Sequence, residues 1–261
     1  MAGNHEGAWA VVDGEIGPLR SARIPVTDLA FQRGWSVFET MELQRGQDPG
    51  PHLLRLERSC AVGLVPGFDA ERIRSEVAEL LEKFEGRAYV RVTLTGSGLR
   101  VITATPSSTV RWHAPVRCER GPHYDDPFLP GFVKHGSRMG WEIEVARRGT
   151  DDVMRTRNGR FTEGTRCGIL AVVGGEVWAH PDDGTILPST TVARLLGHAE
   201  ALGVPVRREG PAEAGPWDGL YIASSTRSIA PVVELDGDVL PGWDPVGRAL
   251  AEADNAWSGR R

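Results

Sequence analysis

The chain has 261 residues, with 30 Lys and Arg against 35 Asp and Glu, which gives a formal net charge of −5. Its 40% hydrophobic and 25% charged residues are typical of an ordinary globular protein and exclude disordered and fibrous classes. No apolar run reaches the roughly 18 residues of a membrane span, and the N-terminus lacks a secretory signal pattern. Mild acidity without a basic cluster argues against nucleic acid as a partner.

The first part of the chain is predicted to form strands and then helices. Residues 8–46 contain an Asp-Gly turn between apolar stretches and an alternating strand. A helical stripe follows over 51–64, and an amphipathic helix is expected over 69–86 with Asp69 as its N-cap. Alternating strands are expected over 88–96, 100–106 and 109–120.

The segment 118–131 is rich in Pro, Gly and Asp, and we predict that it is a linker. It would separate a small α/β subdomain over 1–117 from a larger subdomain over 132–261. The later elements expected are a helix over 138–149, strands and turns over 151–181, a helix over 189–203, strands over 218–235 and a helix over 244–257. This alternation predicts an α+β fold with much antiparallel sheet.

The cysteines Cys60, Cys118 and Cys167 are widely spaced and form no CxxC pair. An odd count without such a pair argues against a disulfide framework or a structural zinc site, and it fits a reducing, cytoplasmic compartment. The seven histidines are scattered and form no close pair, so we predict no metal site.

Only two of the 30 basic residues are lysines, Lys83 and Lys134. A lysine kept under such a strong preference for arginine is a candidate for chemistry that arginine cannot perform, because an amine can lose its proton and attack a carbonyl. Lys83 ends a charged helical pattern, where a solvated side chain is the ordinary interpretation. Lys134 lies between apolar residues and is the better candidate.

Other segments carry groups that bind anions or protons. The helix start in 187–196 and the Ser/Thr-rich turn in 222–232 offer hydroxyls and backbone N–H groups, while Arg55 lies among leucines and Glu163 follows a turn. Each also has a structural interpretation as a helix cap, a local turn, a packing arginine or a surface carboxylate. With Lys134 they form the set that pyridoxal phosphate needs: an amine for its aldehyde, a carboxylate for its ring nitrogen, and hydroxyls and an arginine for its phosphate.

Six short motifs that contain these residues follow one another along the chain. Taken in chain order, they resemble the motifs of the fold-type IV pyridoxal-phosphate enzymes, which include branched-chain aminotransferases, D-amino acid transaminases and aminodeoxychorismate lyases. The resemblance covers nearly the whole chain. The motifs are GWSVFET (34–40), HLLRLERS (52–59), VKHGSRM (133–139), GRFTEGT (159–165), LPSTTVARLL (187–196) and SSTRSIAPV (224–232). The resemblance implies a small N-terminal α/β sandwich, a larger C-terminal pseudo-barrel, and a homodimer.

The same resemblance assigns roles to individual residues. It implies that Lys134 is the Schiff-base lysine and that Glu163 meets the pyridine nitrogen of pyridoxal 5'-phosphate. The residues that it assigns to the phosphate are Arg55, Thr190, Thr191 and Ser225. The chain departs from the family pattern at Met139, Gly168, Ser189 and Val192, where Tyr, Asn, Gly and Arg are common. These departures raise the alternative of a non-catalytic, ligand-binding paralogue.

Within the family, three features favour the lyase that splits aminodeoxychorismate into p-aminobenzoate and pyruvate. The Lys-His-x-x-Arg run over 134–138 and the loop TGSGLR (95–100) are similar to lyase segments, and Thr40 stands where the lyase carries a threonine linked to proton transfer. The residues expected to act on the substrate are Lys134 and Thr40 in catalysis, and Arg100 and Arg138 in binding. The alternative is a class IV aminotransferase of the branched-chain or D-amino acid type, which also acts on a small amino substrate.

Overall fold

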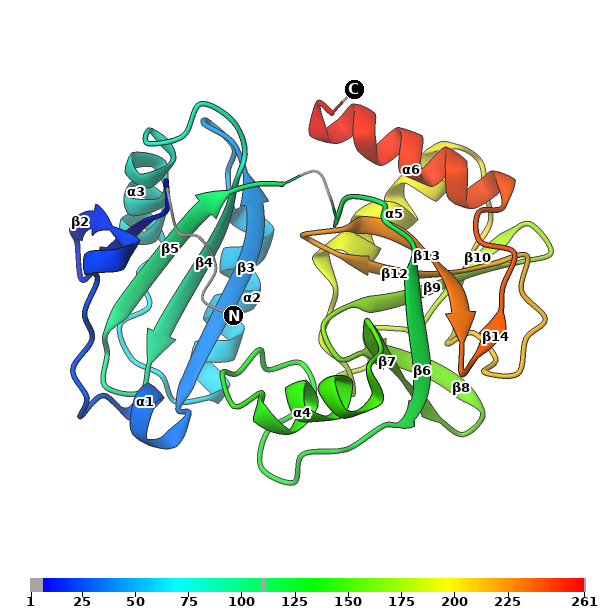
Figure 1. The fold of residues 1–261 in the computed structure, drawn as a ribbon, viewed down its shortest axis with the longest axis horizontal. Helices are drawn as coiled ribbons and strands as arrows, with labels where there is room; N and C mark the ends of the chain where they lie inside the picture. The colour runs from blue at the N-terminus through cyan, green and yellow to red at the C-terminus, as the bar shows by residue number, and fades with distance from the viewer. Residues whose placement is uncertain (1–6, 109–110, 261) are drawn as a thin grey trace. The chain divides into compact units, whose positions relative to one another are not determined.

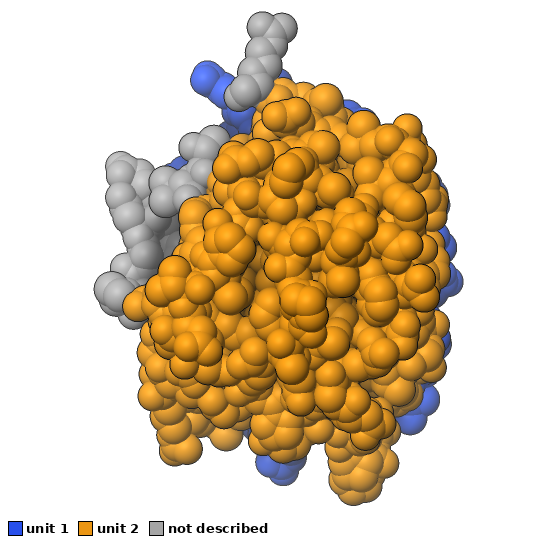
Figure 2. Space-filling model, turned by 90° about the vertical axis from the view of Figure 1, so that its right-hand side faces the viewer, with its two compact units in different colours: residues 1–109, 133–138 blue, residues 110–132, 139–261 orange. Residues whose placement is uncertain are grey.

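The computed structural model of the protein describes residues 7–108 and 111–260. The chain forms two compact units, which Figure 2 colours separately and which are described here one at a time. Unit 1 comprises residues 1–109 and 133–138, and unit 2 comprises residues 110–132 and 139–261. Among the described residues, no helix has both the length and the apolar character needed to cross a membrane.

Unit 1 is built on an antiparallel sheet with the strand order β2-β1-β5-β4-β3 (Figure 1). Its strands are β1 (Trp9–Val12), β2 (Glu15–Pro18), β3 (Ser36–Leu43), β4 (Ala88–Thr95) and β5 (Arg100–Pro106). Its helices are η1 (Leu19–Ser21), α1 (Leu29–Arg33), α2 (Gly50–Val62) and α3 (Ala70–Leu81). The expected hairpin is β1–β2, and its turn residues Asp13 and Gly14 both have positive φ, as the favoured two-residue hairpin turn requires.

The helices α2 and α3 cover one face of this sheet (Figure 1). Successive side chains of a strand point to opposite faces, so every second residue of β4 is buried beneath the helices. The predicted N-cap of α3 is confirmed, because the Asp69 side chain accepts a hydrogen bond from the Arg72 N–H at 3.0 Å. The core under the helices contains Leu53, Leu56, Ile73, Val77, Leu80, Val90, Val92, Leu94 and Ile102.

Unit 2 is built on a sheet that closes on itself. The strands follow the order β11-β10-β9-β12-β13-β6-β7-β8, and a further pairing of β8 with β9 closes a barrel of β9, β12, β13, β6, β7 and β8. The strands are β6 (Val116–Pro122), β7 (Asp152–Arg157), β8 (Arg160–Gly164), β9 (Gly168–Val173), β10 (Glu176–Ala179), β11 (Val206–Arg208), β12 (Gly219–Ser224), β13 (Ser228–Leu235) and β14 (Asp238–Val239). The helices are α4 (Met139–Arg148), α5 (Thr190–Ala201) and α6 (Pro245–Ser258).

Alternation along the barrel strands produces two apolar cores in unit 2. On β9, Ile169 and Ala171 join a core made of strand residues, which fills the barrel. Their neighbours Leu170 and Val172 join a second core to which α5 and α6 contribute, so these helices cover the outside of the barrel. The fold is therefore α+β, with a small α/β unit and a larger barrel unit, as the sequence predicted.

The segment expected to be a linker, 118–131, differs from that expectation at its start. Its first residues belong to β6, which pairs in parallel with both β13 and β7. The strand expected over 109–120 is therefore confirmed in part: it begins only at Val116 and runs on through Gly121 and Pro122, two residues typical of turns that favoured a linker. Residues 109 and 110 of that expected strand lie outside the described residues.

Candidate active site

The lysine segment 133–138 lies beside β3 as a short stretch of paired chain. The Phe38 N–H donates to the Lys134 carbonyl at 3.0 Å, and the Gly136 N–H donates to the Ser36 carbonyl at 2.7 Å. These bonds place Lys134 in unit 1, whereas the sequence assigned it to the larger subdomain. The reason is that this pairing depends on β3, which lies about a hundred residues earlier in the chain and which no local pattern could indicate.

A second contact holds the Lys134 backbone against α2. Its N–H donates to the hydroxyl of Ser59, a fully buried residue, at 3.1 Å. The Lys134 side chain extends to the ring of Phe38, with Nζ 5.0 Å from the ring centroid. The Arg91 guanidinium lies 3.6 Å from the same centroid. Two cations therefore contact one aromatic ring, whose π electrons attract both.

These groups share the face of the sheet opposite α2 and α3. On β3 and β4, Thr40 pairs with Arg91, and alternation puts both on the side of Phe38. Desolvation and the nearby Arg138 both lower the pKa of Arg91. Lys134 and Arg91 thus place positive charge on this face, with Arg138 near enough to act on the pKa of Arg91, and such a group suits a carboxylate-bearing ligand. Arg91 was missed in the sequence because a single arginine in an alternating strand is normally a solvated side chain.

The opposite side of β3 carries Glu39, a carboxylate that the sequence analysis did not single out. Glu39 is fully buried and accepts hydrogen bonds from Arg55 Nε at 2.6 Å, Arg55 Nη2 at 2.7 Å and His52 Nδ1 at 2.9 Å. Burial alone raises the pKa of Glu39, but Arg55 and His52, with a smaller effect of Lys134, lower it to about 2. The structure therefore places Arg55 in a two-bond ion pair, and its role toward a phosphate stays a prediction.

Arg100 does not join the residues around Lys134. It lies on the helix-covered side of the sheet, where its Nε and Nη2 donate to Glu76 of α3 at 2.5 and 2.6 Å. Both side chains are buried, and Glu76 also receives Arg72 Nε at 3.2 Å. Arg100 therefore stabilises the packing of α3, and we leave it out of the proposed substrate site. Its loop resembles a lyase loop, but its side chain points into the core of unit 1.

In unit 2, Glu163 lies on β8 with 7% of its surface exposed. Its Oε2 accepts a hydrogen bond from the Leu187 N–H at 3.3 Å. Glu163 pairs with Gly168, the first residue of β9, where β8 and β9 close the barrel. The last residue of β10, after which the chain runs on to α5, pairs near the same end of β9. The Glu163 carboxylate is therefore buried. It is not the surface carboxylate that a position after a turn ordinarily indicates.

Three of the four departures from the family pattern lie together in unit 2. A Cβ atom added to Gly168 would lie 2.5 Å from Val192 Cγ2 and 3.1 Å from Ser189 Cβ. No larger residue fits at position 168 while Val192 and Ser189 keep these places, so the three departures are one coupled change in packing. Met139 is separate: it begins α4, with 76% of its surface exposed.

The hydroxyl-rich segments form a helix start and a tight turn. Ser189 caps α5 by accepting a hydrogen bond from the Val192 N–H at 3.2 Å, and Thr191 in the first turn is buried. Ser225 lies in the turn that joins β12 to β13, where the Arg227 N–H donates to the Ser224 carbonyl at 3.2 Å. A helix start and such a turn both present N–H and O–H donors, so both suit an anion. Among the described residues, no group of three His, Cys, Asp or Glu could hold a metal ion.

A profile of the family described as Amino-transferase class IV matches residues 36–235. This match spans well over half of the chain, and the protein therefore belongs to that family. Family membership and the fold make it a pyridoxal-phosphate-dependent enzyme, as the sequence predicted.

Individual relatives are distant but cover the chain nearly end to end. The D-alanine aminotransferase of Listeria monocytogenes serotype 4b (strain F2365) is 23% identical over 253 residues, with 87% of each chain covered. The branched-chain aminotransferase of the archaeon Thermoproteus uzoniensis, crystallised with norvaline, is 21% identical with a TM-score of 0.85, covering 97% of this chain and 95% of that chain. An aminotransferase of Brucella abortus bound to PLP is 18% identical with a TM-score of 0.84, covering 97% and 99%.

These relatives are all aminotransferases, and nothing in them supports the lyase specifically. The findings therefore favour the aminotransferase alternative over the lyase expectation. The motif similarities that suggested the lyase include the loop over 95–100, whose Arg100 is a core residue in the structure.

Replacing Arg100 with Leu is expected to destabilise unit 1 without weakening substrate binding. The substitution leaves the buried Glu76 with only Arg72 as partner, and breaking a buried ion pair costs about 3 kcal/mol. Urea unfolding measures the loss, and KM for the amino substrate should stay within about twofold. A KM increase of tenfold or more, with little loss of stability, would return Arg100 to the substrate site.

Glu39→Gln is expected to change how stability responds to acid. The pKa of Glu39 lies below its ordinary value of 4.5, at about 2, so its ionised form stabilises the fold above pH 4.5 and this contribution is lost as pH falls toward 2. The stability difference between the parent protein and the variant should therefore shrink by about 3 kcal/mol over that window. Urea unfolding at several pH values measures it, and a constant difference would mean that Glu39 carries no such shift.

Proposed function

We propose that the protein is an aminotransferase that moves an amino group between an amino acid and a 2-oxo acid, and that Lys134 carries its pyridoxal phosphate. The observation behind this proposal is the group of cations on the face of the unit 1 sheet opposite α2 and α3. Lys134 Nζ and the Arg91 guanidinium lie 5.0 and 3.6 Å from the Phe38 ring centroid, and Arg138 is near enough to affect Arg91. An amine for the cofactor aldehyde and cations for a carboxylate are what an amino-acid substrate requires.

The described residues fit the chemical parts of the cofactor. Lys134 supplies the amine for its aldehyde, and the buried Glu163 carboxylate suits its ring nitrogen. The phosphate suits the start of α5 and the turn before β13, where backbone N–H groups and hydroxyls are presented together. We assign the phosphate to Thr190, Thr191 and Ser225, with Arg55 as a further cation whose orientation Glu39 fixes.

When bound, pyridoxal phosphate supplies an electron sink and a carrier for the amino group. The protein's own part is to orient groups and move protons. Lys134 Nζ takes the proton from the α-carbon of the substrate, acting as a general base. It then acts as a general acid and gives a proton back in the step that transfers the amino group. Glu163 keeps the ring nitrogen protonated. Arg91 and Arg138 bind the substrate carboxylate and so fix which bond to the α-carbon is aligned for proton removal.

Aminodeoxychorismate lyase is the second candidate, and one observation favours it. Thr40 lies on the same face as Phe38 and Arg91, where a lyase would use its hydroxyl for proton transfer. One assay separates the two activities: purified protein is given D- and L-amino acids with 2-oxoglutarate or pyruvate and, separately, aminodeoxychorismate. The aminotransferase proposal predicts a new amino acid in the first reaction and no p-aminobenzoate in the second.

A non-catalytic paralogue is less well supported than either enzyme. The departures that motivate it are Gly168, Val192 and Met139. Val192 and Ser189 occupy the space that a side chain at position 168 would need, and Met139 is exposed at the start of α4. The departures therefore reflect a different packing of the α5 start and do not remove the amine, the buried carboxylate or the hydroxyls.

Lys134→Ala is expected to abolish turnover and the visible absorption of the bound cofactor, because no other amine on this face can replace Nζ. Lys83→Ala is the matched control, because Lys83 Nζ also lies over an aromatic ring, 5.1 Å from the Trp9 centroid. If contact with a ring were all that the lysine contributes, the two variants would have similar effects. Activity and absorption spectra measure both variants. Retained turnover in Lys134→Ala, or loss in Lys83→Ala, would contradict the assignment of the lysine.

Thr40→Val is expected to leave amino transfer within about threefold of the parent rate. Valine keeps the branched shape on β3 and deletes only the hydroxyl, so packing and cofactor binding should be retained. Steady-state kinetics with the best amino donor measure the effect. Loss of a positioned proton-transfer group costs about a hundredfold or more, and a fall of that size would make the Thr40 hydroxyl part of the amino-transfer chemistry.

A further inference from the structure

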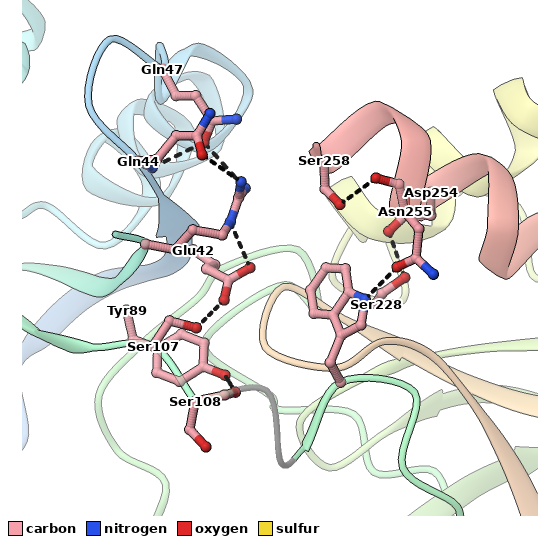
Figure 3. Close-up of polar contacts among 12 residues, drawn as sticks. Glu42, Gln44, Gln47, Tyr89, Ser107, Ser108, Ser228, Asp254, Asn255 and Ser258 are labelled. Carbon is pink, nitrogen blue, oxygen red and sulfur yellow. Dashed lines mark hydrogen bonds and ion pairs between the residues drawn. The ribbon is translucent and has the colours of Figure 1, made fainter. Parts of the chain in front are cut away.

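Two segments far apart in the sequence, the first turns of α5 and the turn between β12 and β13, meet at one buried carboxylate. This carboxylate is Asp254 of α6, which has no exposed surface. It lies within unit 2, and Figure 3 shows it with its neighbour Asn255 and with Ser228. Nothing in the proposed reaction uses Asp254, yet its partners come from the two segments assigned to the cofactor phosphate.

The first partner is Arg194, which lies one turn into α5. Its Nε donates to Asp254 Oδ1 at 2.6 Å and its Nη2 donates to Oδ2 at 3.3 Å. The guanidinium also lies 4.2 Å from the centroid of the Trp257 ring. Residues three and four apart on a helix share a face, so Arg194 lies on the face of Thr191 and Thr190. Fixing Arg194 therefore fixes the rotation of the first turn.

The second partner is Ser228, the residue that ends the β12–β13 turn. Its hydroxyl donates to Asp254 Oδ2 at 2.5 Å, and the residue is fully buried. Ser228 has a φ of +57°, a conformation that residues other than glycine rarely adopt and that needs support from its surroundings. Ser228 pairs with Ser224 across the turn that contains Ser225. The bond to Asp254 therefore holds this turn in its conformation.

The charge of Asp254 is maintained by these partners. Burial alone raises the pKa of Asp254, but Arg194 and Ser228 outweigh it, so the pKa lies below its ordinary value. His198 Nε2 lies 3.4 Å from Oδ1 and adds to this effect when protonated. Asp254 pairs with both Nε and Nη2 of Arg194, and this ion pair holds the helix in place.

We propose that Asp254 is a positioning residue for the cofactor phosphate: through Arg194 and Ser228 it holds the α5 start and the 224–228 turn at one fixed separation. This inference rests on the proposed function, because that function places a phosphate at the two segments. A preformed separation lets both sets of donors reach one phosphate without first ordering either segment, and such preorganisation strengthens binding. The effect depends on the phosphate and not on the pyridine ring.

The chain offers a matched control on the same helix. Asp244 is also buried, and it caps α6 by accepting hydrogen bonds from the Val246 and Gly247 N–H groups at 2.7 and 3.2 Å. It also accepts the Tyr221 hydroxyl of β12. Asp244 contacts neither α5 nor the 224–228 turn in these bonds. Its replacement should destabilise unit 2 without changing the separation of the phosphate segments.

The test compares the affinity of the apoprotein for pyridoxal 5'-phosphate with its affinity for pyridoxal, which lacks the phosphate. In Asp254→Asn the affinity for pyridoxal phosphate should fall about tenfold or more while that for pyridoxal is unchanged, so their ratio falls. Asp244→Asn should lower the thermal midpoint and leave the ratio unchanged. In Ser228→Gly the glycine can adopt the same φ but lacks the hydroxyl that binds Asp254, so the affinity ratio should fall by a smaller factor. This variant provides the test if Asp254→Asn does not fold.

The outcomes separate this inference from the proposed function. If the parent protein prefers pyridoxal phosphate over pyridoxal and the Asp254 and Ser228 variants keep that preference, Asp254 is only a structural residue and the inference fails alone. If the parent protein binds pyridoxal phosphate no better than pyridoxal, or binds neither, the phosphate segments are wrongly assigned and both proposals fail.

Discussion

The pairing of residues 133–138 with β3 is the constraint on which the candidate site depends. Lys134 and Gly136 exchange backbone hydrogen bonds with Phe38 and Ser36, and this approach is close: a Cβ atom on Gly136 would lie 2.1 Å from Ser36 Oγ. A side chain at position 136 would therefore displace the Ser36 hydroxyl from its present place. The pairing fixes the lysine backbone, and the lysine ammonium group then contacts the Phe38 ring on the face of the sheet opposite α2 and α3.

Arginine forks neutralise the buried carboxylates that hold this scaffold together. Arg55 binds Glu39, Arg100 binds Glu76 and Arg194 binds Asp254, each through Nε and Nη2. A planar guanidinium makes two parallel bonds that an ammonium group cannot, and it stays protonated when buried. The scarcity of lysine in the composition is therefore consistent with the structure, in which arginine performs the structural pairing, and with our proposal that the amine at position 134 carries the cofactor.

The sequence predicted elements and chemistry better than it predicted contacts. The helix capped by Asp69 and the α+β class followed from periodicity, and the lysine stood out by composition. The partners of Glu39, the face of Arg91 and the ion pair of Arg100 all depend on strand register and helix packing, which join residues tens of positions apart. The strand expected over 109–120 extends further into the expected linker because pairing with β7 carries it through Gly121 and Pro122, residues that are typical of turns. The coupling of Gly168 with Val192 is likewise a matter of packing volume that no local pattern reveals.

We propose above all that Lys134 holds the cofactor of this class IV aminotransferase. The most direct measurement is borohydride reduction of the holoenzyme followed by proteolysis and mass spectrometry, because reduction fixes pyridoxal phosphate permanently to the amine that carries it. The account predicts a single phosphopyridoxyl adduct on the peptide that contains Lys134, and none on the peptide that contains Lys83. An adduct on Lys83, or unmodified Lys134 in protein that has retained its cofactor, would contradict it.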